Sequence, residues 1–400
     1  MSKLDELIKK YCPNGTEYKR IEELCDILDS KRKPVSKEKR IKGKYPYYGA
    51  NGIQDYINDY LFDGTFLLIG EDGSVINKDK SPVLNWVTGK IWVNNHAHIL
   101  KSKDICLLRY IYYVLQTIDI SMMVRGTPPK LNQFSLKCMR IPVPPLPVQE
   151  EIVRILDSFT KLTEELTEEL TEELINRKKQ YEYYRDELLN FDKINKYCPN
   201  GIKYKKLEEF ATINRGGSLQ KKDFVDKGIP CIHYGQIYTK YGLFADKTFT
   251  YISEKIASKQ KFAEKNDIVM AVTSENLKDV CSCLAWLGNE KIAISGHTAI
   301  IHHNQNAKFM SYYFHSIHFQ KQKNKLAHGT KVIEVTPSKL KNIIIPIPSI
   351  VEQECIVDIL DKFEVMYNNL YSEISAEIEL RKKQYEYYRD KLLTFKELKQ

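Results

Sequence analysis

The sequence predicts an α+β protein. Two globular domains of mixed α/β structure are joined by two long antiparallel helices, which form a coiled coil within an internal pseudo-twofold repeat. Three observations predict this fold class. Two blocks of sequence occur twice in the 400 residues, a long amphipathic pattern accompanies each copy, and the segments between the blocks contain strand-like apolar runs. A hydrophobic fraction of 42% supplies enough apolar material for buried cores.

The repeated blocks are too similar to be coincidental. Residues 10–15 read Lys-Tyr-Cys-Pro-Asn-Gly, and residues 196–201 read the same. The ten residues 177–186 return unchanged as residues 381–390. Between the blocks, the two copies differ in length and share little sequence. We infer that a duplication produced one fixed frame that carries two different inserts.

The repeat divides the chain into five segments. We expect the first part of a split helical frame in residues 1–13, a first globular domain in 14–147, a central long helix with a linker in 148–198, a second globular domain in 199–350 and a C-terminal long helix in 351–400. The two ends of the chain correspond to complementary parts of one frame segment. We therefore expect the two termini to lie next to each other.

The two predicted helices have apolar residues at steps of three and four, which marks one helix face. We expect the following residues to pack helix against helix: Phe159, Leu162, Leu166, Leu170, Leu174, Tyr181, Phe363, Leu370, Ile374, Ile378 and Tyr385. Each helix covers about 40 residues, or ~60 Å. Because neither helix can bury its stripe alone, antiparallel packing is favoured over separate docking on the domains. Residues 162–173 contain three Leu-Thr-Glu-Glu units, which either set a distance or form a solvated acidic face.

Each insert contains patterns of both strands and helices. Residues 66–70 and 267–272 are short apolar runs that are typical of strands, and residues 110–115 have a helical pattern. Each insert is therefore expected to be a mixed α/β domain.

The distribution of charge favours a polyanionic partner for the inserts. Lys and Arg number 61 against 52 Asp and Glu, a net charge of +9. Residues 160–190 carry −4 and residues 364–394 carry −1, so the rest of the chain carries +14. An AT-rich genome, which enriches Lys, explains the total charge equally well. With no apolar run near the roughly 20 residues that span a bilayer, no signal peptide and nine scattered Cys, we expect a cytoplasmic protein that binds no membrane.

A search for catalytic motifs finds none. The nucleotide-binding pattern G-x-x-x-x-G-K-[ST] is absent, as is the Asn-Pro-Pro-aromatic motif of amino-methyltransferases. Residues 70–73 read Gly-Glu-Asp-Gly, which indicates a turn more than a cofactor loop. The pairs His96 and His98, and His302 and His303, lack companion ligands at metal spacing. We expect no catalytic, cofactor-binding or metal-binding residues in this chain.

Basic side chains that alternate with Tyr, Asn and Gln offer contacts to both phosphates and base edges of DNA. A solvated loop is the alternative in each insert. Chosen for this chemistry, the candidates of the first domain are Arg32, Lys33, Lys37, Tyr48, Asn51, Asn95 and His96. Those of the second domain are Arg215, Lys221, His233, Tyr234, Gln236, Asn276 and Lys331.

Five stretches of the chain resemble the specificity subunits of type I restriction–modification systems. They are the run of residues 141–157, the Arg-Lys-Lys-Gln-Tyr block at 177–181, and residues 47–52, 70–75 and 92–98 of the first insert. The likeness covers essentially the whole chain. One departure is that the second copy of the Pro-rich run has Ser349 in place of the second residue of the Pro-Pro pair.

The resemblance implies that each insert is a target recognition domain, which reads one half of a bipartite, asymmetric sequence in double-stranded DNA. The long helices set the distance between the half-sites and dock two methyltransferase subunits, and restriction–translocase subunits join the assembly for adenine methylation or cleavage. S-adenosylmethionine, ATP and Mg²⁺ belong to those partners, so this chain has no cofactor of its own. The alternatives are a stand-alone coiled-coil DNA-binding or interaction protein and, less favoured, a cryptic nuclease.

Overall fold

The computed structural model describes residues 2–103, 105–194 and 201–398. The chain forms two compact units: unit 1 contains residues 1–170 and 375–400, and unit 2 contains residues 171–374. The predicted boundary at residue 198 and most of the second Lys-Tyr-Cys-Pro-Asn-Gly block lie outside the described residues. Within the described part, no helix is both long and apolar enough to cross a membrane.

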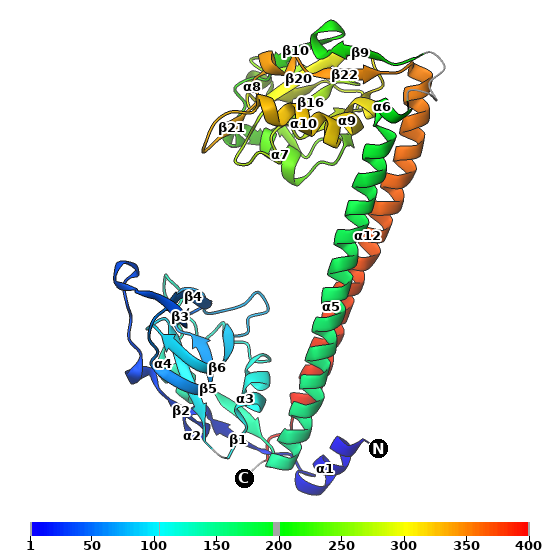
Figure 1. Cartoon of the computed structure of the whole chain (residues 1–400). Helices are drawn as coiled ribbons and strands as arrows, with labels where there is room; N and C mark the ends of the chain where they lie inside the picture. Colours follow the sequence, from blue (N-terminus) through cyan, green and yellow to red (C-terminus); the bar gives the residue numbers. More distant parts are fainter. Residues whose placement is uncertain (1, 104, 195–200, 399–400) are drawn as a thin grey trace. The chain divides into compact units, whose positions relative to one another are not determined.

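Unit 1 is built around one mixed sheet (Figure 1). Its elements are α1 (Lys3–Tyr11), β1 (Glu17–Arg20), α2 (Ile21–Leu24), β2 (Cys25–Ile27), β3 (Lys42–Gly49), β4 (Gly52–Ile57), β5 (Phe62–Gly70), β6 (Leu84–Val93), β7 (Ala97–Ser102), α3 (Leu108–Leu115), α4 (Gln133–Cys138) and β8 (Arg140–Val143), followed by α5 (Leu146–Leu188). The six strands are ordered β2-β7-β5-β6-β3-β4, and only the β3–β6 pair is parallel. The predicted strand at 66–70 is the buried end of β5, and the predicted helix at 110–115 is α3, which packs against it.

Unit 2 contains two five-stranded sheets and is likewise mixed α/β. Its elements are α6 (Phe191–Ile194), β9 (Lys203–Lys206), β10 (Ala211–Arg215), β11 (Phe224–Val225), β12 (Ile229–Ile232), α7 (Tyr234–Thr239), β13 (Phe244–Ala245), β14 (Thr250–Ile252), α8 (Glu254–Ala257), β15 (Lys261–Ala263), β16 (Ile268–Ala271), β17 (Thr273–Ser274), β18 (Cys283–Trp286), β19 (Ile292–Ile294), β20 (Thr298–His303), α9 (Ala307–His315), α10 (Ile317–Leu326), β21 (Ile333–Glu334), α11 (Pro337–Leu340), β22 (Ile344–Ile347) and α12 (Ile350–Leu393). One sheet is ordered β10-β20-β16-β18-β13 and the other β11-β14-β12-β19-β15. The predicted strand at 267–272 is β16, and α9 covers it.

The duplicated sequence produces duplicated anchors between each domain and its long helix. The Ile-Pro-x-Pro copies form β8 and β22, which pair with β1 and β9 respectively. Gln149 and Gln353 follow, both fully buried. The side-chain amide of each donates to the carbonyl of the residue five positions earlier, at 2.7 and 2.9 Å. The side-chain oxygen of each accepts a backbone N–H from its own domain, that of Leu107 at 2.9 Å and that of Asn306 at 3.0 Å.

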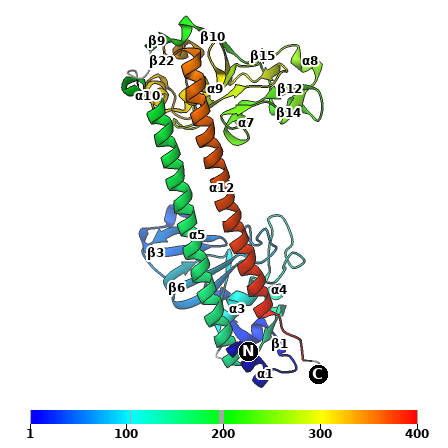
Figure 2. The same cartoon turned by 90° about the vertical axis from the view of Figure 1, so that its right-hand side faces the viewer.

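Both units contain an antiparallel pair of helix segments, because α5 and α12 each contribute one end to each unit (Figure 2). In unit 1, the rings of Phe159 and Tyr388 lie 6.2 Å apart. At the matching positions of unit 2, the rings of Phe363 and Tyr184 lie 5.9 Å apart. The predicted α+β fold with packed long helices is therefore confirmed.

The predicted seam between the helices is only partly buried. Ile374 is buried, and most of the other expected residues are half-buried: Leu166, Leu170, Leu174, Tyr181, Phe363, Leu370, Ile378 and Tyr385. Phe159 is 39% exposed although it contacts Tyr388. Leu162 is 61% exposed, so its expected place in the seam is wrong. The physical reason is that residues four apart advance by ~40° around a helix, so a row of such residues drifts off the contact face.

The two termini meet within unit 1, as the repeat predicts. The backbone N–H of Thr16 donates to the carbonyl of Lys396 at 2.9 Å, and the N–H of Leu398 donates to the carbonyl of Thr16 at 3.0 Å. Gly15 has a φ of +112°, and a Cβ there would lie 2.2 Å from the Lys396 oxygen, so this close approach requires glycine. The ends of the chain thus complete one frame segment together.

Candidate DNA interface

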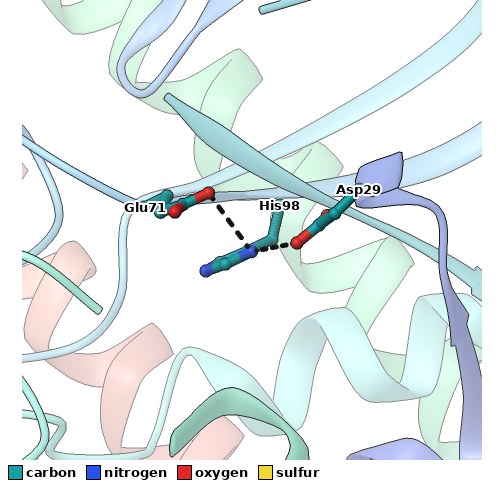
Figure 3. A group of neighbouring side chains, drawn as sticks. All are labelled: Asp29, Glu71 and His98. Atoms are coloured by element: carbon teal, nitrogen blue, oxygen red, sulfur yellow. Dashed lines mark hydrogen bonds and ion pairs between the residues drawn. The ribbon is translucent and has the colours of Figure 1, made fainter. Parts of the chain in front are cut away.

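A network of charged and polar side chains lies in the interior of unit 1. His98, fully buried on β7, places Nδ1 2.6 Å from an Asp29 carboxylate oxygen and 3.6 Å from a Glu71 oxygen (Figure 3). Its Nε2 lies 2.9 Å from the carbonyl oxygen of Leu131. The three side chains come from three separate segments, and this is why the sequence search found no companions for His98.

The network is neutralised by cations of the protein itself. The guanidinium of Arg32 lies 2.5 Å from Glu71, and the ammonium of Lys130 lies 3.1 Å from the other oxygen of Glu71. Burial opposes the ionisation of Asp29, but hydrogen bonding to His98 and the nearby Arg32 hold its pKa below the usual value. Asp29, Glu71 and His98 each offer one ligand atom, and these atoms lie within 4.8 Å of one another. Their polar atoms also have partners within the protein, namely Arg32, Lys130 and the carbonyl of Leu131.

The structure also brings together several of the predicted DNA contacts of unit 1. The turn that precedes β7 contains Asn95, which is exposed, and His96, which is half-exposed. Nδ1 of His96 contacts the carboxylate of Asp72. The neighbouring Asn94 donates its backbone N–H to the carbonyl of Tyr48 at 3.0 Å. Residues from β3, from the segment after β5 and from the turn before β7 are thus neighbours.

The other predicted residues of unit 1 have different surroundings. Arg32 is 12% exposed at its side chain and donates to the carbonyl of Ala97 at 2.8 Å, so its guanidinium is part of the interior network. Asn51 lies exposed in the turn between β3 and β4. Lys33 is exposed beside β6, where its carbonyl accepts the indole N–H of Trp92 at 2.6 Å. Lys37 is exposed on a separate short 3₁₀ turn.

Unit 2 presents a polar surface of different composition. The guanidinium of Arg215 lies 3.0 Å from the carboxylate of Glu334 and donates to the carbonyl of Gly296 at 2.8 Å. The next residue, His297, is exposed and places Nδ1 3.1 Å from the Thr273 hydroxyl. Its ring centroid lies 4.9 Å from that of Tyr234.

The predicted residues of unit 2 are distributed around this surface. The ring of His233 lies 4.6 Å from that of Tyr234, and burial lowers the pKa of His233, as do the charges of Lys221 and His297. Gln236 is buried and accepts the backbone N–H of His233 at 2.9 Å, which caps α7. Two further predicted residues lie on loops next to the β17–β21 pair: these are Asn276, bonded to Asp279, and Lys331, which is exposed.

Sequence reasoning missed His297 and Glu334 at this surface. The signal that could have found His297 is its position directly before a central strand, which matches that of His96 in unit 1. The weak similarity of the two inserts hides this correspondence in the sequence. The Gly216–Gly217 pair beside Arg215 faces protein: a Cβ at Gly216 would lie 2.1 Å from the carbonyl oxygen of Ser295.

Comparison with known proteins identifies the family. The family described as type I restriction modification DNA specificity domain matches twice, over residues 13–176 and 199–380. The chain belongs to this family. A putative type I restriction enzyme specificity subunit of Haemophilus influenzae is 36% identical over 399 residues, and the match covers 95% of each chain. The EcoR124I/EcoR124II specificity subunit of Escherichia coli is 32% identical and is matched over 86% of this chain and 89% of its own length.

The fold of this type I specificity subunit is also found in a solved structure. One chain of a type I restriction–modification system, solved to describe complex assembly and conformational transition, superimposes with a TM-score of 0.63. The match covers 95% of this chain and 98% of that one at 16% identity, and therefore supports the fold. As a specificity subunit, the chain recognises DNA and is not itself an enzyme.

A second candidate surface of the specificity subunit is the ten-residue repeat on the long helices. Tyr183 and Tyr387 occupy the same position in the two copies and are 60% and 62% exposed. Each forms an edge-to-face pair with the following Tyr, with centroid distances of 5.5 Å and 5.3 Å. Identical sequence thus produces the same exposed aromatic pair in both units.

Proposed function

We propose that the two units of this specificity subunit read the two different halves of a bipartite, asymmetric sequence in double-stranded DNA. The observation that carries the proposal is that one duplicated family domain presents two different polar surfaces. Unit 1 offers Asn95 and Tyr48 at or beside the turn before β7, whereas unit 2 offers Tyr234 at the start of α7 and the exposed His297. Since direct readout depends on the pattern of donors and acceptors, different surfaces fit different half-sites.

We further propose that two methyltransferase subunits dock on the two copies of the ten-residue repeat. Two identical exposed surfaces fit two copies of one partner, because the same side chains offer the same contacts at Tyr183 and at Tyr387. Restriction subunits then join this assembly, and adenine methylation or cleavage is the outcome. S-adenosylmethionine, ATP and Mg²⁺ belong to those partners, and the complex acts in the cytoplasm, where the DNA lies.

A methylation map tests the proposal for DNA reading. The chain is co-expressed with its neighbouring methyltransferase subunit in a host free of DNA methylation, and modified adenines are mapped at base resolution. We expect one two-part motif with unlike halves. A symmetric motif, or no motif from a soluble complex of the two proteins, contradicts the proposal. Absence of Mg²⁺-dependent cleavage by the purified chain separates this function from that of a nuclease.

The docking proposal has a matched pair of variants. Tyr183→Asp alters one copy of the repeat and Tyr387→Asp alters the other, and Lys362→Asp serves as a control at an exposed helix position outside the repeat. By mass measurement in solution, we expect two methyltransferase subunits per control chain, one per single variant and none for the double variant. Two subunits on the double variant would show that docking uses another surface.

A further inference from the structure

The two units share a central geometry that their sequences hide. In unit 1, β5 and β7 pair so that Gly70 lies opposite Ala97. In unit 2, β16 and β20 pair so that Ala271 lies opposite Thr298. Both residues of the second pair are 201 positions after those of the first, so the two central strand pairs have the same register. This correspondence allows the residues around them to be compared one by one.

The residue directly before the second strand of each pair is a histidine. His96 in unit 1 and His297 in unit 2 are again 201 positions apart, as are the residues that hold their rings. Nδ1 of His96 contacts Asp72, and Nδ1 of His297 lies 3.1 Å from the Thr273 hydroxyl. Within the part of the chain that the structure describes, Nε2 of neither ring has a protein partner.

The contacts at Nδ1 leave Nε2 of each ring as the atom that can meet a ligand. The Thr273 hydroxyl can donate to Nδ1 of His297, and this favours the tautomer with hydrogen on Nε2. In unit 1, the carboxylate of Asp72 occupies Nδ1 of His96. His96 and His297 therefore present the same imidazole edge from the same place in the fold.

A second shared element is an exposed Gly-Thr hairpin, which precedes α4 in unit 1 and α11 in unit 2. Gly126–Thr127 and Gly329–Thr330 lie at the tips, and both glycines have positive φ, +87° and +109°. In unit 1, Arg125 and Lys130 close the hairpin with reciprocal backbone hydrogen bonds of 2.8 and 3.0 Å. In unit 2, His328 and Glu334 do so with bonds of the same two lengths.

Each hairpin is attached to the end of the central strand. The backbone N–H of Leu131 donates to the carbonyl of Glu71 at 2.8 Å, and the N–H of Val335 donates to the carbonyl of Val272 at 3.0 Å. Each hairpin also lies next to the residue that holds the histidine. The backbones of Lys130 and Asp72 form a β-bridge, and Glu334 lies opposite Thr273 in the β17–β21 strand pair. Histidine and hairpin thus form one surface in each unit, which we call the shared corner.

We propose that the shared corner binds the sugar–phosphate backbone of each half-site without reading its bases. This inference rests on the proposed function, in which the two units read different half-sites. A side chain that is the same in both units cannot distinguish two different base sequences, but the phosphates are the same in both. The imidazole of the histidine and the exposed hydroxyl of Thr127 or Thr330 are groups of the kind that contact phosphate oxygens, and the exposed Lys331 adds a positive charge in unit 2.

The shared corner also fixes where base reading takes place. The residues beside it differ completely between the units: the β3–β4 hairpin with Asn51 in unit 1 corresponds to the start of α7 with Tyr234 in unit 2. Phosphate contacts set the register of a protein on the duplex, and base contacts then specify the sequence. The common residues therefore position the DNA, and the dissimilar residues read it.

Binding measurements on the complex of the full chain with its methyltransferase subunits test this division. The probes are a duplex that carries the mapped motif and a duplex of random sequence, each titrated at several KCl concentrations. We expect His297→Ala to weaken both affinities by the same factor, about fivefold for one lost hydrogen bond, with the methylation motif unchanged. The double variant with His96→Ala should lose about 25-fold, the product for independent sites.

Two further variants separate a contact from a folding defect. Thr330→Val removes only an exposed hydroxyl and should weaken both duplexes equally, by about twofold. Lys247→Ala, an exposed residue after the edge strand β13, should change neither affinity. Unchanged affinity of the double histidine variant overturns the proposal, as does a motif that relaxes in one half-site. A wild-type chain that yields no bipartite motif instead contradicts the proposed function, so the two failures can be told apart.

Discussion

A buried lysine of α10 allows a test of what holds the loop between β17 and β18 in place. Lys323 is fully buried, and its ammonium donates to the backbone carbonyls of Leu277, Lys278 and Val280 at 2.9, 3.1 and 2.9 Å. These carbonyls belong to the loop between β17 and β18, which carries the predicted DNA contact Asn276. We consider the substitution Lys323→Met, which keeps the length of the side chain and removes its donors.

The structure sets the size of the effect. Hydrogen bonds to a charged group contribute about 1.5–3 kcal/mol each, and three are lost. Burial lowers the pKa of Lys323, so removal of the ammonium also relieves part of a desolvation cost. Once the loop is released, its three carbonyls can also form hydrogen bonds with water, which offsets part of the loss. We therefore expect a net destabilisation of the loop by about 3 kcal/mol, or ~100-fold in its opening equilibrium.

Hydrogen exchange followed by mass spectrometry measures this opening directly. Amides of residues 276–282 should exchange ~100-fold faster in Lys323→Met, whereas amides of β5 in unit 1 serve as an internal reference and should not change. Lys325→Met, an exposed lysine of the same helix, is the matched control. Equal exchange of the loop in both variants would refute the view that the buried ammonium holds it.

Three further outcomes are expected. Burial raises the pKa of Cys25, Cys106 and Cys281 to about 12, so at pH 8 iodoacetamide should alkylate the exposed Cys355 well before them, as peptide mass spectrometry would show. Hydrogen bonds from Arg154 and Lys3 lower the pKa of Glu151 from 4.5 to about 2, so the contact of Glu151 with Lys3 of α1 is intact above pH 4.5 and is lost as the pH falls toward 2. Hydrogen exchange of the α1 amides should report this loss, and Glu151→Gln should remove the pH dependence. Deletion of one Leu-Thr-Glu-Glu unit shortens α5 by ~6 Å and should change the spacer in the methylation motif by one or two base pairs; an unchanged spacer would mean that these units set no distance.

Most of the architecture could be predicted from the sequence, because it rests on repeated and periodic patterns. The identical blocks at 177–186 and 381–390 predict two equivalent helices, and the apolar runs at 66–70 and 267–272 predict the central strands, all of which the structure contains. The exposed position of Leu162 could not be predicted in this way. Its place in the row of leucines is periodic, but the drift of that row relative to the partner helix depends on how the two helices cross.

The candidate site was predictable only in part, because residue type does not tell which way a side chain points. Arg32 and His96 are both polar residues suited to DNA, yet the guanidinium of Arg32 lies inside the network with Glu71 while His96 is half-exposed. Gln236 has the chemistry of an adenine contact, and the structure uses its oxygen to cap α7. Whether these residues touch DNA stays a prediction.

By itself, the sequence determined the duplication, the long helices and the membership of this chain in the family of type I specificity subunits, because those properties are written in local and repeated patterns. Only the tertiary structure decided which polar residues meet. Asp29, Glu71 and His98 form one network although long stretches of chain separate them, and His96 and His297 become equivalent only through the register of their strands. Ion pairs and strand register depend on distances in space, and these distances cannot be read from the spacing of residues along the chain.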